Sequence, residues 1–372
     1  MPPVHYHNGR FPPASIDWPR LIPLLGPANA AVARFEGVLE GIPNVDVLLS
    51  PLTTQEAVLS SRIEGTQATF GEVLEYEAGG GRTDESGEKS ADIQEILNYR
   101  VALRQAVTQL ESLPLSQRIV KDAHRALMDG VRGHGKAPGE YRRTEVWIGA
   151  PGSPMKTARF IPLEAGKVPQ AMSDWEKYLH SKQPDRLVQL AIAHAEFEAI
   201  HPFLDGNGRL GRLLVPLFLR AQGLLARPNF YISAYLEQHR DQYYDRLLGV
   251  SRDGEWTGWC AFFLTAITKQ AEANGAKARA ILELYRADRL WITEATHSHH
   301  AVTALDWFFS RPIFNSSDFI AGSAVPKATA NRILRVARDG GRLREFRPAS
   351  GRRPAILGYP ALLNIAEGRK AF

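Results

Sequence analysis

Cysteine is almost absent from this sequence, which has only Cys260 among its 372 residues. A single cysteine excludes an intrachain disulfide and is typical of proteins from a reducing cytoplasm. The sequence has no apolar run long enough to span a bilayer, and its first residues lack the basic and apolar regions of a secretory signal. We therefore expect a cytoplasmic protein that does not contact membranes.

Charge is unevenly distributed along the chain. Hydrophobic residues make up 44% and charged residues 23%, an ordinary globular mixture that can fill two or three domains. Residues 301–372 hold twelve Lys and Arg against five Asp and Glu, a net charge of +7, which leaves −2 for residues 1–300. A basic tail on a slightly acidic body predicts a separate module with an anionic partner.

The most reactive group of side chains lies in residues 201–212, which read HPFLDGNGRLGR. The flanking segments 187–200 and 210–225 have the apolar content and spacing of buried helices, so the motif is predicted to be a loop that runs into the second helix. Backbone N–H groups at the start of a helix lack intrahelical partners and lie at the positive end of its dipole. The Gly-Asn-Gly turn therefore predicts a cradle for an anion.

The side chains of this segment add the other parts of a phosphate site. Arg209 and Arg212 are three residues apart on one helix face, where two guanidinium groups can clamp a polyphosphate. Asp205 offers the hard oxygen ligand that Mg²⁺ takes beside substrate phosphates. His201 can accept a proton from an attacking hydroxyl. Together they predict nucleotidyl or phosphoryl transfer to a hydroxyl.

The segment matches every defined position of the motif HxFx[DE]GNGRxxR and so resembles the Fic (filamentation induced by cAMP) family. The resemblance implies a protein adenylyltransferase, in which a Tyr, Thr or Ser hydroxyl of a target protein, or of the enzyme itself, attacks the α-phosphate of ATP. It implies that His201 is the base, that Phe203 anchors the loop within the nucleotide site and that Asp205 binds Mg²⁺. It assigns the phosphates to Gly206, Asn207, Gly208, Arg209 and Arg212.

A shorter pattern precedes the motif. Residues 60–65, SSRIEG, close a helix predicted over 51–63 and fit the family's inhibitory pattern [ST]xxxE[GN], in which Ser60, Glu64 and Gly65 are the defined positions. The resemblance implies that Glu64 pairs with Arg212 while Ser60 bonds near the same carboxylate. An arginine held by a carboxylate cannot clamp a phosphate, so we expect weak activity in the unaltered chain.

Residues 139–162 alternate β-forming residues around a Pro/Gly turn and predict a β-hairpin. By the resemblance this hairpin is a flap whose edge pairs with the backbone of the target, and Trp147, Ile148 and Gly149 are the candidates for that edge. The alternative is a hairpin that only covers the core.

Two long helices are predicted over 231–250 and 255–287. The resemblance implies that the pair Tyr243 and Tyr244 lines an adenine pocket, with Tyr243 as the candidate contact. Ser251 stands where some relatives have an Asn whose amide contacts adenine. Recognition of the base is therefore less well supported than recognition of the phosphates.

Residues 301–366 resemble a winged helix–turn–helix, with helices predicted over 301–309, 316–321 and 326–339 and strands over 342–347 and 353–357. The third helix presents side chains suited to phosphates and base edges: Lys327, Thr329, Asn331, Arg332 and Arg335. DNA is one partner for such a module. Winged helices also dock proteins or form dimers, so a homodimer stays open.

The sequence thus predicts a mainly α-helical protein in three parts: an N-terminal helical segment with the inhibitory motif (1–88), a Fic core with a β-hairpin flap (89–290) and a winged-helix domain (300–372). An exposed loop is expected at 78–87. The expected activity is Mg²⁺-dependent transfer of AMP from ATP. Three alternatives are removal of AMP in the same site, a DNA-binding regulator whose core senses nucleotide, and transfer from another phosphate donor.

Overall fold

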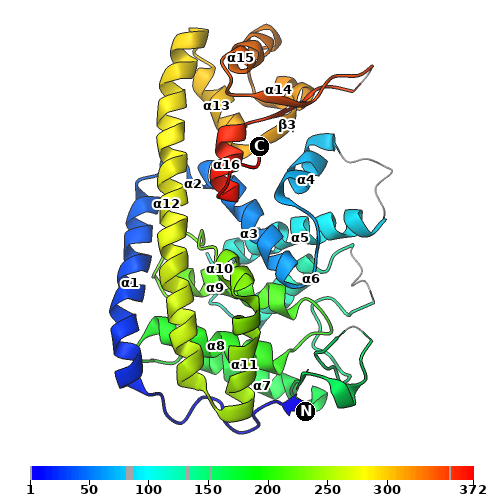
Figure 1. The fold of residues 1–372 in the computed structure, drawn as a ribbon, viewed down its shortest axis with the longest axis vertical. Coiled ribbons are helices and arrows are strands. Elements are labelled where there is room, and N and C mark those ends of the chain that lie inside the picture. Colours follow the sequence, from blue (N-terminus) through cyan, green and yellow to red (C-terminus); the bar gives the residue numbers. More distant parts are fainter. Residues whose placement is uncertain (1, 81–86, 131–134, 151, 352) are drawn as a thin grey trace. The chain divides into compact units, whose positions relative to one another are not determined.

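The computed structural model describes residues 2–80, 87–130, 135–150, 152–351 and 353–372. Residues 81–86 of the predicted loop and residue 151 of the predicted hairpin lie outside the described residues. The fold is mainly helical, as predicted (Figure 1). Contacts divide it into one unit of Met1–Glu36, Leu59–Gly65 and Asn98–Glu272, and another of Gly37–Val58, Thr66–Leu97 and Ala273–Phe372. The three-part division expected from the sequence stays a prediction.

Two buried helices, α8 (Arg186–Ile200) and α9 (Asn207–Ala221), pack against each other in the first unit. The first begins at Asp185, whose Oδ1 accepts the N–H groups of Leu187 and Val188 at 2.8 and 3.0 Å. Nearly every residue of both helices is buried. The short connection 201–206 is therefore anchored at both ends by the core.

Further helices surround this pair. Helices α7 (Val168–His180) and α11 (Arg240–Asp253) pack on α8, and α6 (Gln117–Leu127) packs on α9. The helix predicted over 231–250 is divided into α10 (Ser233–Gln238) and α11 because His239 leaves the helical conformation. The remaining long helices are α1 (Trp18–Glu40), α3 (Ser50–Ile63), α5 (Gly87–Gln109) and α12 (Trp256–Thr296).

The predicted hairpin has little regular β structure. Its strand β2 (Phe160–Ile161) pairs in parallel with β1 (Val4–His5), and its antiparallel pairing in the described residues is one bridge between Ile148 and Phe160. A 3₁₀ turn, η2 (Met155–Thr157), follows Pro154, which has no N–H to donate to a ladder. The flap is thus a folded-back loop held by one bridge. A second short turn, η3 (Ala165–Lys167), leads into α7.

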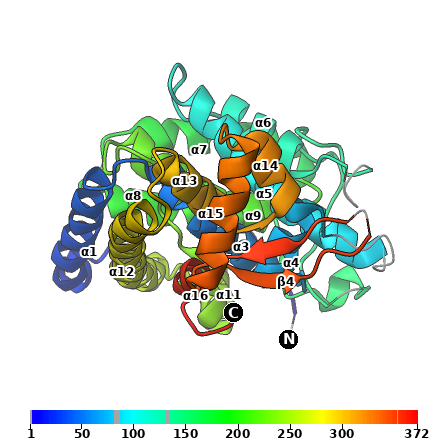
Figure 2. The ribbon, with the colours of Figure 1, turned by 90° about the horizontal axis from the view of Figure 1, so that it is seen from above.

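The second unit contains the C-terminal module, with the three helices and two strands expected from the sequence and two further elements (Figure 2). They are α13 (Ala301–Ser310), β3 (Ile313–Asn315), α14 (Ser316–Gly322), α15 (Lys327–Asp339), β4 (Arg344–Arg347), β5 (Ile356–Gly358) and α16 (Pro360–Glu367). The antiparallel sheet has the order β3-β5-β4, and its core includes Phe308, Phe314 and Phe319. Sequence reasoning missed β3 and α16, which are too short to show a clear period.

The second unit also contains α2 (Val45–Leu48), α4 (Phe70–Glu75) and the π-helix η1 (Tyr76–Gly80). Thr69 caps α4 together with Glu72: the Thr69 hydroxyl accepts the N–H of Glu72, and the Glu72 carboxylate accepts the N–H of Thr69. Among the described residues, no helix has the length and apolar character needed to cross a membrane.

Candidate functional site

The loop of the motif begins and ends on residues in left-handed conformations. His201 ends α8 with φ 51° and ψ 63°, and Gly206 precedes α9 with φ 77°. The side chain of Asn207 closes the loop, because its Oδ1 accepts the Phe203 N–H at 2.9 Å and its amide donates to the Phe203 carbonyl at 2.9 Å. The Asn207 side chain therefore fixes the shape of the loop. Asn207 could contact a phosphate only through its backbone N–H.

Phe203 is fully buried and its ring stacks on that of His124, with centroids 3.8 Å apart. His124 accepts the Gly139 N–H at Nδ1 and therefore donates from Nε2 to the Asp205 carbonyl, at 2.8 and 2.9 Å. Burial lowers the pKa of His124 to about 4, which keeps its ring neutral. These contacts hold the middle of the loop against α6.

A buried arginine that the sequence did not indicate, Arg142, holds the backbone of the turn at His201. Arg142 donates from Nε to the His201 carbonyl at 2.8 Å, and its backbone N–H bonds the Pro202 carbonyl at 2.9 Å. Its remaining donors serve the carbonyls of Thr144, Leu163 and Ile200. This guanidinium therefore connects the turn at His201 to Thr144 and Leu163, which lie near the two ends of the flap segment.

The imidazole of His201 lies at the wall of a cavity and is neutral at physiological pH. Burial, followed by the charge of Arg142, lowers its pKa, and the Glu198 backbone, Glu64 and Asp205 oppose this only in part, so that the pKa is about 4. A neutral imidazole can accept a proton, which is what a general base requires.

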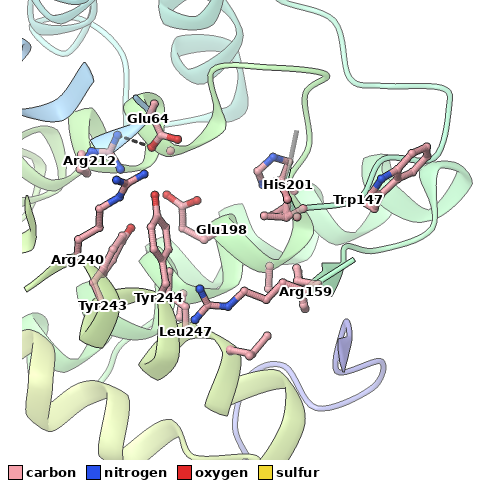
Figure 3. A pocket seen from close by; sticks show the side chains of 18 of the residues that line it. Glu64, Trp147, Arg159, Glu198, His201, Arg212, Arg240, Tyr243, Tyr244 and Leu247 are labelled. Carbon is pink, nitrogen blue, oxygen red and sulfur yellow. Dashed lines mark hydrogen bonds and ion pairs between the residues drawn. The ribbon is translucent and has the colours of Figure 1, made fainter. Parts of the chain in front are cut away.

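Arg212 is wholly buried and held by the end of α3 (Figure 3). Its Nε donates to the Ser60 hydroxyl at 2.9 Å, and its Nη2 donates to the Ser60 carbonyl at 2.8 Å and to Glu64 Oε1 at 2.7 Å. Burial raises the pKa of Glu64, but the charge and hydrogen bond of Arg212 outweigh burial and leave that pKa below its ordinary value. Glu64 and Arg212 form an ion pair, and Gly65 follows with φ 103°.

The Glu64 carboxylate lies directly over the start of α9. A Cβ atom added to Gly208 would lie 2.2 Å from Glu64 Oε1 and 3.2 Å from Arg212 Nη1, so a residue with a side chain cannot stand there without displacing the carboxylate. An anion at this place meets the positive end of the helix dipole. Glu64 thus takes the position predicted from the sequence for a phosphate.

Asp205 is half exposed beside the same helix start. Its Oδ1 accepts the Gly206 N–H at 2.6 Å and lies 3.7 Å from Nη2 of the buried Arg209. Among the described residues, no three His, Cys, Asp or Glu side chains are grouped as a metal site. Mg²⁺ bound to a nucleotide needs only one or two carboxylates besides phosphate oxygens, so Asp205 alone fits that kind of site.

A cavity of about 690 Å³ opens between His201, Arg212 and α11 (Figure 3), which is within the usual size range of ligand sites. Both predicted tyrosines line it. Tyr243 is buried and bonds His194 through its hydroxyl at 3.0 Å, whereas the Tyr244 ring has Arg159 and Arg240 at 5.9 and 5.7 Å. Tyr244 therefore offers the more accessible ring face for stacking.

The flap residues lie at the mouth of this cavity. Trp147 and Ile148 are 44% and 38% exposed, which is unusual for large apolar side chains, and Gly149 also lines the cavity. Ile148 uses its backbone groups to bridge Phe160, with hydrogen bonds of 2.9 and 3.1 Å.

Sequence reasoning missed three charged residues of the cavity, Arg159, Glu198 and Arg240. Glu198 stands three residues before His201 on α8, and burial raises the pKa of its carboxyl to about 8. Arg240 contributes a further guanidinium from α11. The available signal for Glu198 was its position one helical turn before His201, which places both side chains on the same face of the chain.

The candidate DNA-binding residues are in the second unit, on α15. Lys327, Asn331, Arg332 and Arg335 are exposed and Thr329 is half-buried, while Ala330, Ile333, Leu334 and Ala337 face the core. The helix thus presents a polar and basic face to solvent.

Comparison with known proteins agrees with this geometry. The model of the Fic/DOC family N-terminal region matches residues 22–108, and that of the Fic/DOC family matches residues 114–219. The chain is 29% identical to a protein adenylyltransferase Fic from Drosophila grimshawi over 176 residues, or 45% of this chain and 32% of that protein. It is 36% identical to one from Culex quinquefasciatus over 122 residues, or 32% of this chain and 21% of that protein. The chain therefore spans about a third or less of these curated relatives.

Two solved structures share the fold. A Fic family protein from Desulfovibrio desulfuricans superposes with a TM-score of 0.59 at 22% identity, covering 94% of this chain and 98% of its own. A Fic domain containing signalling protein from Bacteroides thetaiotaomicron superposes with a TM-score of 0.53 at 16% identity, covering 68% and 97%. With one family model matched through residues 22–108 and the other through the motif at 201–212, this chain belongs to the Fic/DOC family.

Proposed function

We propose that this protein is an adenylyltransferase, which transfers AMP from ATP to a Tyr, Thr or Ser hydroxyl of a target protein or of itself. The observation that carries the proposal is that the neutral imidazole of His201 shares one cavity with the anion-binding start of α9 and with Arg212. The names of the curated relatives support the same activity.

In this reaction the target hydroxyl oxygen attacks the α-phosphorus of ATP. The new O–P bond forms while the bond from the α-phosphorus to the pyrophosphate oxygen breaks, and the hydroxyl proton passes to His201. Proton removal contributes about 10²- to 10⁴-fold, and the rest comes from positioning and from electrostatic stabilisation by the α9 amides, Arg209 and Arg212. Asp205 would hold Mg²⁺, which neutralises part of the triphosphate charge when bound.

Glu64 is proposed as an internal inhibitor of this site. Its carboxylate lies over Gly208 and pairs with Arg212, so a terminal phosphate must displace it before the triphosphate can bind in a reactive pose. Ser60 reinforces the block because its hydroxyl and carbonyl occupy two more donors of the same guanidinium.

The flap is proposed to align the target. Ile148 directs its backbone groups towards Phe160. Successive residues of an extended chain direct theirs to opposite sides, so Trp147 and Gly149 would present N–H and carbonyl groups to an incoming strand. Pairing through the main chain would accept varied target sequences.

The test is transfer of a labelled AMP group. The wild type and Glu64→Gly are incubated with ATP labelled at the α-phosphate, first alone and then with a cell lysate, with His201→Ala in the Glu64→Gly background as control. We expect labelled protein that increases in Glu64→Gly and disappears in the control. Absence of label in Glu64→Gly would overturn the proposal.

Two further measurements separate the alternatives. Release of AMP from a previously modified protein, with no net labelling, would favour removal of AMP. Mass spectrometry of the automodified protein would reveal another phosphate donor by the mass of the added group.

A second candidate function, DNA binding by the C-terminal module, is favoured by the exposed basic face of α15. Arg332→Ala and Arg335→Ala are expected to weaken binding to duplex DNA and to reduce its dependence on salt. Arg338→Ala is the matched control on the same helix, because Arg338 pairs with Glu345 at 3.0 Å. If no DNA shift is seen, light scattering tests whether the module forms a homodimer instead.

A further inference from the structure

A second carboxyl group, that of Glu198, faces the same cavity as Glu64 and Arg212 (Figure 3). Its Oε1 is buried, and so is Nη1 of Arg212. Neither atom has a hydrogen-bond partner among the residues that the structure describes. A carboxyl oxygen of Glu198 and an N–H donor of Arg212 therefore both lack a hydrogen-bond partner beside the ion pair of Glu64 and Arg212.

Two glycines on α9 make room for the two carboxyl groups. A Cβ atom on Gly208 would lie 2.2 Å from Glu64 Oε1, and one on Gly211 would lie 2.2 Å from Glu198 Oε1. Residues three apart are neighbours on one helix face. Both carboxyl groups therefore pack against the part of α9 just before Arg212, where the two glycines carry no side chain. Residue 211 lies at a position that the family motif leaves undefined.

The charges around Arg212 explain why Glu198 is not part of the ion pair. Burial raises the pKa of Glu198 to about 8, Arg212 opposes this rise and the charge of Glu64 adds to it. The carboxyl is therefore mostly protonated at neutral pH while Glu64 is ionised. The ionisable groups that line the cavity with Glu198 are Glu64 after α3, His201 and Asp205 between α8 and α9, Arg212 on α9, Arg240, Tyr243 and Tyr244 on α11, and Arg159 before β2. His194 on α8 lies 3.9 Å from Glu198 Oε1 through its Nε2.

We propose that Glu198 is a reserve counter-ion of Arg212, which neutralises the buried guanidinium when Glu64 is withdrawn and so keeps it in place for the phosphates. A guanidinium that is wholly buried cannot lose its only carboxylate without a large cost, so a second carboxylate must take over. When Glu198 replaces Glu64 as the counter-ion of Arg212, the Glu198 carboxyl releases its proton to solvent. When a triphosphate then supplies negative charge, Glu198 takes a proton up again.

This inference gains its meaning from the proposed function, but its first test needs no nucleotide. The carboxyl ¹³C signal of Glu198, assigned by its loss in Glu198→Gln, is titrated in the full-length wild type and in Glu64→Gly. We expect a midpoint near pH 8 in the wild type and a midpoint lower by about one pH unit or more in Glu64→Gly. An unchanged midpoint would overturn the proposal.

A double-mutant cycle gives an independent readout. Glu198→Gln should lower the melting temperature only slightly in the wild type at pH 7, where it replaces a neutral group. In Glu64→Gly it should lower the melting temperature much more, because Arg212 then has neither carboxylate. Glu111→Gln, at an exposed position, is the control in both backgrounds. Additive effects of the Glu64 and Glu198 substitutions would contradict the proposal.

Calorimetry then links the inference to nucleotide binding. ATP binding to Glu64→Gly, measured in buffers of different ionisation enthalpy, should take up protons, and Glu198→Gln should remove most of this uptake. Binding without uptake would contradict the role of Glu198 and leave the proposed function intact. Absence of ATP binding would count against the proposed function, while the titration and the cycle still decide the role of Glu198.

Discussion

Replacing Glu64 with glycine is expected to strengthen ATP binding by about 10- to 30-fold. The carboxylate of Glu64 and a terminal phosphate need the same two features, the Arg212 guanidinium and the amides at the start of α9. In the wild type the phosphate must displace the carboxylate, whereas in Glu64→Gly this competitor is absent. The substitution follows the last residue of α3, Ile63, so it does not put a glycine inside a helix.

The size of the effect follows from the contact that is removed. A hydrogen bond between charged groups contributes about 1.5 to 3 kcal/mol. The Glu64 side chain is 37% exposed, so solvent weakens the pair and the lower part of this range, about 1.5 to 2 kcal/mol, applies. Since 1.4 kcal/mol corresponds to a factor of ten, the expected gain in affinity is about 10- to 30-fold.

The measurement is the dissociation constant for ATP by calorimetry, with the wild type, Glu64→Gly and Glu64→Gln compared in one buffer. Glu64→Gln keeps the size of the side chain but removes its charge, so its affinity should lie between the other two. Glu111→Gly serves as the control for a glycine at an exposed position. Equal affinities of the wild type and Glu64→Gly would refute the competition between carboxylate and phosphate.

Three other predictions follow from the site. Arg142→Met should lower kcat more than it raises KM, because the buried guanidinium holds the carbonyl of His201. It should also cost about 3 kcal/mol or more of stability in urea unfolding, because the buried carbonyls of Leu163 and Ile200 lose their donor as well, at about 1 to 3 kcal/mol each. Arg142→Lys should rescue both effects in part; equal kcat values would contradict this. The rate of transfer by Glu64→Gly should fall only at about pH 4 or below. The pKa of His201 is lowered to about 4 in the wild type, loss of the Glu64 charge lowers it further, and the protonated ring cannot accept a proton; an acid limb near pH 6.5 would argue against it. Tyr244→Leu should weaken ATP binding more than Tyr243→Leu, because the Tyr243 ring is buried and its hydroxyl bonds His194; the reverse order of affinities would favour Tyr243 as the stacking residue.

The parts of the fold that were predictable are those with a strong local pattern. The apolar runs on either side of the motif predicted α8 and α9, and therefore a loop that carries His201 between two buried helices. Pro326 and the apolar spacing after it likewise indicated α15. In each case the residues that determine the element lie within the element itself.

The features that sequence reasoning missed depend on residues far apart in the chain. Arg142 gains its importance from carbonyls of the His201 turn and of Leu163, and no local pattern around residue 142 indicates these contacts. The flap has little β structure because β2 pairs with the two-residue strand β1 from the N-terminus, which is too short to show alternation. The position of the Glu198 carboxyl could not be predicted because it depends on Gly211, which lies on the neighbouring helix α9.

The most direct test of the central claim is a crystal structure of Glu64→Gly with a non-hydrolysable ATP analogue. The account predicts that the terminal phosphate occupies the place over Gly208 that the Glu64 carboxylate fills in the wild type, with the imidazole of His201 facing the α-phosphorus. A triphosphate bound elsewhere in the cavity, with His201 turned away from it and Arg212 making no phosphate contact, would contradict the account.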